Sequence, residues 1–419
     1  MSRFQLARAI ALAATLASSG RAHASGDTDQ VLTGQVVSAH SRWARGGTAI
    51  VTESVLRLDD GSEVTVRQLG GSVDGIGMLV IPAPAVLRPG DRVSAEVTIG
   101  RDLRGQESRL IERLWAATEP GASGSSVTGG GRMPFVRTVA TRTHAPLAWE
   151  SSCAIVTFHA DGTTHVAGDG EFEAMEAVIA TWRQAIAGCS YLDLQIGDRE
   201  SGEVGLDGTN LVIYREDRWC RPATDGDPEE CYDPSAAGLT TLYFIDDDDS
   251  DRNGAILDAD IELNAVDFAI AVAGETTHGD RCLSEISNTF THEVGHLIGL
   301  DHTCFAGGDR LMDDQGDPQP NCSPVDALSA AQRDATMYNF QDCGETQKAT
   351  PEQDDVDGVC GIYPIADDPG ECSSPDLEDK GCCAVAGSRT TPTGALPVLA
   401  LALAALMFLR RRRRHGTSL

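Results

Sequence analysis

Residues 291–302 read Thr-His-Glu-Val-Gly-His-Leu-Ile-Gly-Leu-Asp-His and hold three histidines and one glutamate at fixed spacing. His292 and His296 are four residues apart, so on a helix they project from one face, one turn apart. Two imidazoles placed in this way can share one tetrahedral Zn²⁺. Glu293 lies about 100° around the same helix, where its carboxylate can exchange protons with a water on the metal. The segment therefore predicts a helix that carries a metal site.

The neighbouring residues complete this predicted site. A separate apolar stripe of the same helix faces away from the two histidines and consists of Ile286, Phe290, Val294 and Leu297. Gly299 can turn the chain at the helix end without a Cβ penalty, which lets His302 return as a third ligand. Three neutral imidazoles leave an open position on the ion for water, whose pKa falls toward ~7. We therefore expect His292, His296 and His302 to bind one catalytic Zn²⁺, with Glu293 as general base. The alternative is a helix face without metal.

The whole pattern, HExxHxxGxxH, is similar to the signature of the metzincin zinc endopeptidases. That family also has a methionine-containing turn beneath the metal, and residues 335–340 resemble it. The resemblance makes Met337 the structural Met-turn residue, while Met312 is the competing candidate. Residues 350–363 are similar to the last helix of the matrixins, a branch of the family.

Residues 259–264 are similar to the substrate-side edge strand of the matrixins. A peptide can dock on an edge strand as one more strand. The resemblance therefore implies a set of residues that align the substrate: Ile261, Glu262, Leu263 and Asn264.

The matrixin resemblance covers roughly residues 145–365 and implies the fold and the activity. The expected fold is an α+β metzincin-like catalytic domain, with a mixed, mostly parallel twisted sheet and an active-site helix, preceded by a small all-β domain. The expected activity is hydrolysis of peptide bonds in proteins by zinc-activated water, with Glu293 as general base, so the partners are protein or peptide substrates. The alternative is a catalytically silent, zinc-containing surface binding module.

The N-terminal part divides by composition. Residues 1–24 have the positive start, short apolar run and small-x-small site of a signal peptide. Residues 25–117 alternate in the manner of strands and predict a small β-barrel or sandwich accessory domain. Residues 118–132 are a Gly/Ser-rich linker, and the resemblance implies that residues 133–366 form the peptidase domain. An inhibitory pro-segment that is removed by cleavage near the linker is the alternative for residues 25–117.

The C-terminal end contains a second candidate targeting signal. Residues 367–393 are a Cys-containing spacer, and residues 394–419 contain an apolar run followed by an arginine cluster. A single-pass anchor is the plain interpretation, with the cluster on the cytoplasmic side. The order also resembles the tripartite sorting tail of myxobacterial surface proteins, which implies sorting or processing machinery as a partner. We expect an exported protein, secreted or held at the cell surface through this tail.

Charge and cysteine content narrow the function further. The formal net charge is −30, and such a chain repels nucleic acid phosphates, which excludes a nucleic-acid function.

Export makes disulfides possible. Ten cysteines between residues 153 and 372 can form five bridges, of which Cys153–Cys189 and Cys220–Cys231 are the expected pairs.

An acidic segment offers a second metal site. Asp249, Asp251 and Asn253 stand at alternate positions before Gly254, and Asp260 falls at the twelfth position of the loop. This spacing resembles half an EF-hand loop, whose oxygen ligands suit Ca²⁺. An acidic hairpin without metal is the alternative.

Overall fold

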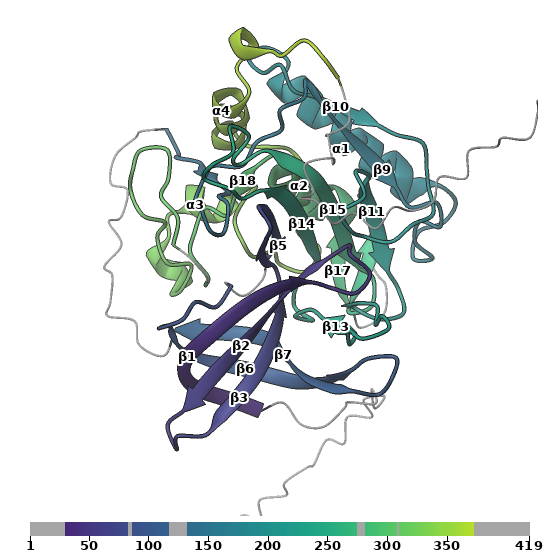
Figure 1. Cartoon of the computed structure of the whole chain (residues 1–419). Coiled ribbons are helices and arrows are strands. Elements are labelled where there is room, and N and C mark those ends of the chain that lie inside the picture. Colours follow the sequence, from purple (N-terminus) through teal and green to yellow (C-terminus); the bar gives the residue numbers. More distant parts are fainter. Residues whose placement is uncertain (1–29, 83–85, 117–131, 275–280, 308–309, 373–419) are drawn as a thin grey trace, which may run out of the picture. The chain divides into compact units, whose positions relative to one another are not determined.

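The computed structural model describes residues 30–82, 86–116, 132–274, 281–307 and 310–372 (Figure 1). The chain divides into two compact units, residues 1–377 and 378–419, and all the described residues lie in the first. The predicted signal peptide and apolar tail lie outside the described residues, as does nearly all of the predicted linker. None of the helices in the described ranges combines the length and the apolar character that a membrane span needs.

Five strands close into a barrel in the order β1-β2-β3-β7-β6. They are β1 (Gln30–Trp43), β2 (Ile50–Leu58), β3 (Glu63–Leu69), β6 (Arg92–Arg101) and β7 (Glu107–Ala116). Alternate residues point inward, and apolar side chains such as Val36, Leu56 and Val66 fill the interior. The strand order is that of a five-stranded Greek-key barrel.

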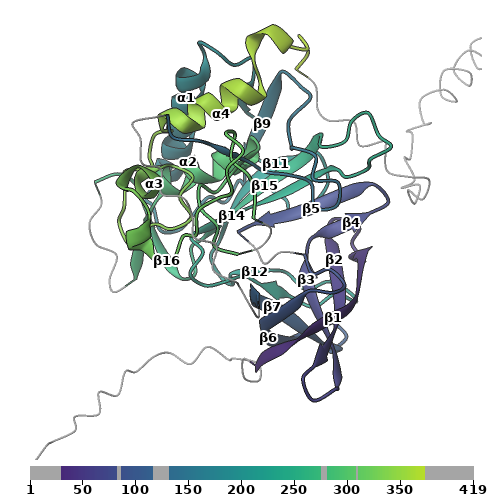
Figure 2. The same ribbon diagram turned by 90° about the vertical axis from the view of Figure 1, so that its left-hand side faces the viewer.

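A seven-stranded sheet supports the metal motif and has the order β10-β9-β11-β15-β14-β5-β4. Its strands are β4 (Gly71–Val73), β5 (Ile76–Ile81), β9 (Cys153–Phe158), β10 (Asp193–Ile196), β11 (Asn210–Arg215), β14 (Gly238–Ile245) and β15 (Ile256–Asn264). Strands β10, β9, β11 and β15 pair in parallel, whereas β15, β14, β5 and β4 pair antiparallel. The β4–β5 hairpin comes from between β3 and β6 of the barrel, so the N-terminal part of the chain contributes to this sheet (Figure 2).

The expected fold class, an α+β domain with a mostly parallel sheet after a separate all-β domain, is wrong. The described residues form eighteen strands and four α-helices, arranged as a closed barrel and several sheets, so the structure is mostly β. Half of the pairings in the main sheet are antiparallel, and two of its strands come from residues 71–81. Alternating apolar residues show that a segment is a strand, but they do not show which sheet the strand joins.

The expected edge strand is also wrong. Strand β15, which contains Ile261 to Asn264, pairs with β11 on one side and with β14 on the other. All four side chains are buried, and Glu262 accepts hydrogen bonds from Arg215 Nε (2.5 Å) and from the Tyr232 hydroxyl (2.7 Å). With both backbone edges paired, these residues offer no place where a peptide could add a strand.

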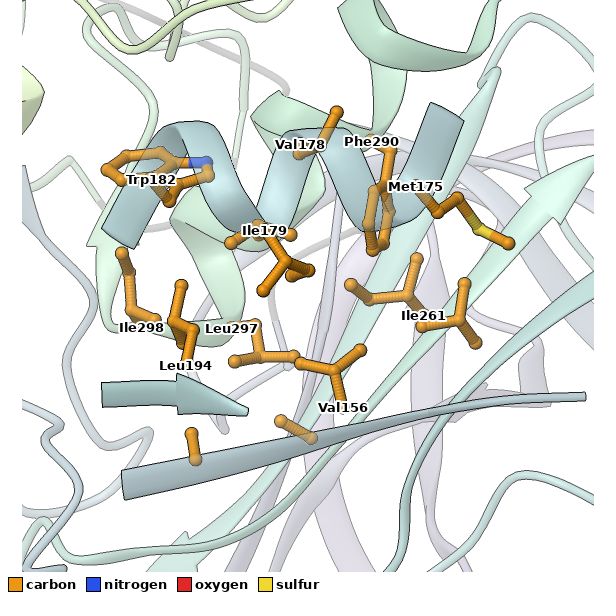
Figure 3. Close-up of a cluster of buried hydrophobic side chains, with 14 of the residues drawn as sticks. Val156, Met175, Val178, Ile179, Trp182, Leu194, Ile261, Phe290, Leu297 and Ile298 are labelled. Atoms are coloured by element: carbon orange, nitrogen blue, oxygen red, sulfur yellow. The ribbon is translucent and has the colours of Figure 1, made fainter. Parts of the chain in front are cut away.

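The main core lies between the sheet and two helices, α1 (Gly170–Ile186) and α2 (Ile286–Leu297). Figure 3 shows Ile179 of α1 on the side of the helix that faces Val156 and Leu194 of the sheet, and Val178 and Trp182 belong to the same buried core. The Trp182 indole Nε1 donates to the carbonyl of Thr291 on α2 at 3.2 Å. This packing fixes the helix that carries the histidines against the sheet.

Short elements complete the described structure. They are β8 (Val136–Arg137), β12 (Cys220–Arg221), β13 (Glu230–Cys231), β16 (Phe268–Ala271), β17 (Cys282–Glu285), β18 (Leu300–Asp301), α3 (Ala330–Asp334), α4 (Gln353–Ile362) and two 3₁₀ turns, Val325–Ala327 and Ile365–Asp367.

All ten cysteines between residues 153 and 372 form disulfides, which confirms five bridges. The pairs are Cys153–Cys372, Cys189–Cys360, Cys220–Cys231, Cys282–Cys343 and Cys304–Cys322. The expected Cys220–Cys231 pair is confirmed, whereas Cys153–Cys189 is wrong, because Cys153 and Cys189 each join a C-terminal segment that is distant in sequence. Five disulfides are typical of a protein exported to an oxidising compartment.

We expect the long-range bridges to matter more for stability than the local one. Changing Cys189 and Cys360 together to Ser removes a link across 171 residues and lowers the free energy of unfolding by about 2–5 kcal/mol. The Cys220–Cys231 bridge closes only 11 residues, so the matching double change lies at the low end of that range. Urea titrations of both variants measure the difference, and equal losses would contradict the loop-length argument.

Candidate metal centre

Helix α2 carries His292 and His296, and the chain turns after its end so that His302 comes back toward them. The Glu285 side chain caps its start by accepting a hydrogen bond from the Asn288 amide at 2.7 Å. Gly299 follows the helix with φ +94°, a conformation that favours glycine, and a Cβ there would lie 2.9 Å from the Leu147 carbonyl oxygen. Strand β18 then pairs with β8, and His302 follows directly.

The three histidines converge through the same ring atom. The Nε2 atoms of His292 and His296 lie 3.1 Å apart, those of His296 and His302 also 3.1 Å apart, and those of His292 and His302 3.3 Å apart. Among the described residues, these histidines form one of two groups of potential ligands close enough to share an ion. The other group contains Cys220 and Cys231, whose sulfurs are already joined in a disulfide.

Backbone carbonyls fix two of the rings. His292 Nδ1 lies 2.6 Å from the Thr336 carbonyl oxygen, and His296 Nδ1 lies 2.9 Å from that of Leu300. Because each Nδ1 must donate to its carbonyl, the Nε2 lone pairs are free for a metal. Burial lowers the pKa of His296 to about 4 and lowers the pKa values of His292 and His302 well below their ordinary value. All three rings are therefore neutral near pH 7.

Three neutral nitrogens this close repel one another, and a cation between them removes the repulsion. Zinc–imidazole bonds of about 2.0–2.1 Å in a tetrahedral site place ligand nitrogens about 3.3–3.4 Å apart. The observed separations of 3.1 to 3.3 Å come near this value. The donor set and its spacing therefore fit one divalent metal ion with room for a further ligand.

Glu293 is buried beside this group and is held by the sheet. The Thr240 hydroxyl of β14 donates to Glu293 Oε2 at 2.7 Å. A Cβ at Gly238, the first residue of β14, would lie 2.7 Å from Glu293 Oε1, so the strand approaches the carboxylate closely. Burial raises the pKa of Glu293 to about 8, although the Thr240 hydrogen bond opposes this shift. Neither Thr240 nor Gly238 was predicted as a site residue, because no local sequence pattern marks either of them.

Met337, the predicted Met-turn residue, packs against the helix that carries His292 and His296. It is buried, and a Cβ at Gly295 would lie 2.3 Å from its sulfur, so the thioether packs directly against α2 between the two helical histidines. The competing candidate Met312 is 55 % exposed. The residue after Met337 is held by buried Lys348, whose Nζ donates to the Tyr338 carbonyl oxygen at 3.2 Å. Lys348 was also missed, although it is one of only two lysines in the chain.

The predicted calcium ligands do not come together. Asn253 Oδ1 accepts from the Thr143 hydroxyl at 2.9 Å, and Arg142 lies against the neighbouring acidic residues. Asp260 is elsewhere: its carboxylate accepts from the amides of Gly205 (2.7 Å) and Leu211 (3.0 Å). Within the described ranges, Asp249, Asp251 and Asp260 form no group close enough to share an ion. The EF-hand spacing fails here because the segment connects the antiparallel strands β14 and β15, and Asp260 lies within β15.

Asp260 instead belongs to a buried acidic pair with Asp258. Asp258 Oδ2 accepts from the amides of Asp207 (2.8 Å) and Gly208 (2.6 Å), whereas its Oδ1 has no partner among the described residues. Burial raises the pKa of Asp258 to about 7 and raises the pKa of Asp260 as well. The folded chain therefore holds a proton in this pair that an unfolded chain, with Asp pKa values near ~3.9, releases.

We expect this pair to make stability depend on pH. Between about pH 4 and pH 7 the folded state binds more protons than the unfolded state, so the free energy of unfolding falls as pH rises. Asp258→Asn should remove part of this pH-dependent decrease in the free energy of unfolding, since an amide side chain does not titrate in this range. Urea titrations at pH 4.5 and 7.5 measure the slope, with exposed Asp161→Asn as control. An unchanged slope in Asp258→Asn would count against a shared proton.

Comparisons with known proteins add little to this geometry. Neither a protein-family model nor a curated protein matches the chain. Among solved structures, the SSB domain of a protein from Synechococcus sp. is 20 % identical, with a TM-score of 0.16, over 22 % of this chain and 98 % of that one. Metalloproteinase-II from Bacteroides fragilis is 9 % identical, with a TM-score of 0.26, over 81 % of this chain and 93 % of that one. Both similarities are too weak to indicate a function.

Proposed function

We propose that the chain is an exported, zinc-dependent endopeptidase that acts on proteins or peptides. The observation that carries the proposal is the convergence of three neutral Nε2 atoms, 3.1 to 3.3 Å apart, with the carboxylate of Glu293 on the same helix. The HExxHxxGxxH motif and buried Met337 resemble the metzincin pattern and support the same activity.

Each residue has a distinct role in this proposal. His292, His296 and His302 would hold the ion, and the carbonyls of Thr336 and Leu300 keep two of the rings in the required tautomer. When bound, zinc polarises a peptide carbonyl and lowers the pKa of water. In its ionised form, above its raised pKa, Glu293 takes the proton from the attacking water and passes it to the leaving amine. Thr240 holds this carboxylate in place through its hydroxyl.

The location and the partners follow from the same proposal. Five disulfides fit an extracellular site of action. The C-terminal tail would hold the enzyme at the cell surface and engage sorting or processing machinery. With a net charge of −30, the chain would not act on nucleic acid.

Metal analysis and proteolysis together test the proposal. The chain without residues 1–24 is purified with zinc and incubated with unfolded casein and with a mixed peptide library. We expect about one zinc per chain and slow appearance of internal cleavage products that stops on chelation. One zinc per chain without any cleavage would contradict the peptidase and favour a surface binding module.

A further inference from the structure

A second cavity adjoins the one at the metal centre. The cavity at the metal centre has a volume of about 440 Å³ and is lined in part by His302, whereas the second has a volume of about 400 Å³. Val139 and Leu311 line both cavities, so the two are in contact. Half-buried Phe135 and exposed Met312 add further apolar surface to the second cavity. A polypeptide that lies over the metal centre can therefore extend into it.

One wall of the second cavity is formed by the chain around β8, where side chains alternate in direction. Phe135 and Arg137 line the cavity, whereas Val136 and Thr138 are buried in the protein. Strand β8 is paired on both sides, with β18 on one side and through the Val136↔Asp313 bridge on the other. The position of Arg137 in this wall is therefore fixed by the backbone.

Arg137 brings a positive charge to the cavity without an acidic partner. Its Nη2 donates to the Leu147 carbonyl oxygen at 3.0 Å, whereas its buried Nε has no hydrogen-bond partner among the described residues. No carboxylate in the part of the chain that the structure describes forms an ion pair with it, and burial lowers the pKa of Arg137. An anion bound here would supply both the missing acceptor and the missing charge.

The two acidic residues that line the cavity are already engaged. Asp314 is paired with Arg132, and Asp313 Oδ1 accepts hydrogen bonds from two backbone amides, both at 2.9 Å. A second arginine, Arg310, lines the same cavity, and its Nη1 donates to the Gln319 carbonyl oxygen at 2.6 Å. With Asp314 neutralised by its partner, two arginines and one aspartate remain, and this balance of charge favours an anion.

We propose that the cavity at Arg137 binds a carboxylate carried next to an apolar side chain, and that the peptidase thereby prefers substrates with such a group. The carboxylate would accept from the Arg137 guanidinium, while the apolar side chain would pack on Phe135 and Met312. The C-terminus of a polypeptide and an acidic side chain both offer this chemistry. Binding at this cavity does not need the metal, but the preference in cleavage rests on the proposed function.

Binding is tested on the full, zinc-loaded chain with Glu293→Gln, so that the peptides are not consumed. Calorimetric titration compares acetyl-Ala-Leu-Phe as the free acid with the same peptide as the C-terminal amide. We expect the acid to bind roughly tenfold tighter or more, because a charge-assisted hydrogen bond to Arg137 is lost in the amide. Adding Arg137→Gln should remove the difference, whereas adding Arg109→Gln, at an exposed arginine of β7, should leave it.

The source of the carboxylate is tested with acetyl-Leu-Glu-Phe amide. Affinity equal to that of the free acid identifies an acidic side chain as a ligand, and affinity equal to that of the plain amide identifies the C-terminus; both results support the site. Equal binding of acetyl-Ala-Leu-Phe acid and amide would overturn it. A difference that persists in Arg137→Gln would also overturn it, since the carboxylate would then bind elsewhere, for example at the metal.

A second variant keeps the test decisive if Arg137→Gln does not fold. Met312 is 55 % exposed, so Met312→Asp places a negative charge at the cavity with little effect on packing. We expect it to weaken binding of the acid roughly tenfold and to leave binding of the amide unchanged. Unchanged binding of the acid by Met312→Asp would contradict the proposed cavity.

Cleavage by the unmodified zinc-loaded chain separates this inference from the proposed function. Fluorogenic peptides that end in Leu-Phe are compared as acid and amide, and we expect a roughly tenfold higher kcat/KM for the acid, through KM, that is lost in Arg137→Gln. A binding preference without cleavage of either peptide would overturn the peptidase and leave the carboxylate site. Cleavage of both peptides with equal kcat/KM would overturn the substrate preference and leave the peptidase.

Discussion

Glu293→Gln is expected to lower kcat/KM for peptide cleavage by about 10²–10⁴-fold while leaving about one zinc per chain. The amide has nearly the same volume and can still accept the hydrogen bond from Thr240, so the buried site keeps its packing. What it loses is the ability to take a proton from water and to return it to the leaving amine. The result is measured as initial rates on a fluorogenic peptide, with metal counted by elemental analysis.

The control for this change is Glu176→Gln, on the exposed side of α1. It alters the net charge in the same way, and we expect unchanged rates. A Glu293→Gln protein that cleaves at the unmodified rate would remove Glu293 from the mechanism. A variant that has lost its zinc would instead show that the carboxylate helps to hold the ion.

The metal centre could be predicted from sequence because its parts are local. Helical periodicity places His292 and His296 on one face, and a glycine that tolerates positive φ returns His302 within six residues. Met337 was reached through a resemblance, since its contact with Gly295 joins segments 42 residues apart in the numbering. Thr240 and Lys348 could not be found, because they act through tertiary contacts that a single sequence does not display.

The sheet was harder to predict because strand neighbours are non-local. The aliphatic run at Met78–Ile81 indicates a strand equally well in the barrel or in the main sheet. Its attachment to β14 depends on side chains more than 150 residues away. The same limit explains why β15 was expected at an edge and why Cys153 was paired with a nearby cysteine instead of Cys372.

The second large effect concerns metal removal and His296. Chelation of the unmodified chain should abolish cleavage and destabilise the fold, because binding to the folded state alone stabilises it by about 4 kcal/mol when free zinc is a thousandfold above its Kd.

His296→Ala should behave like the chelated chain: no cleavage, no bound zinc and no shift of Tm when zinc is added. The reason is geometric, since His296 Nε2 lies 3.1 Å from both other ligand nitrogens and its ring is completely buried. Differential scanning calorimetry with and without zinc measures the shift, and exposed His40→Ala of the barrel is the control. Zinc-dependent stabilisation that survives in His296→Ala would show that the ion binds elsewhere, and the proposed centre would then be wrong.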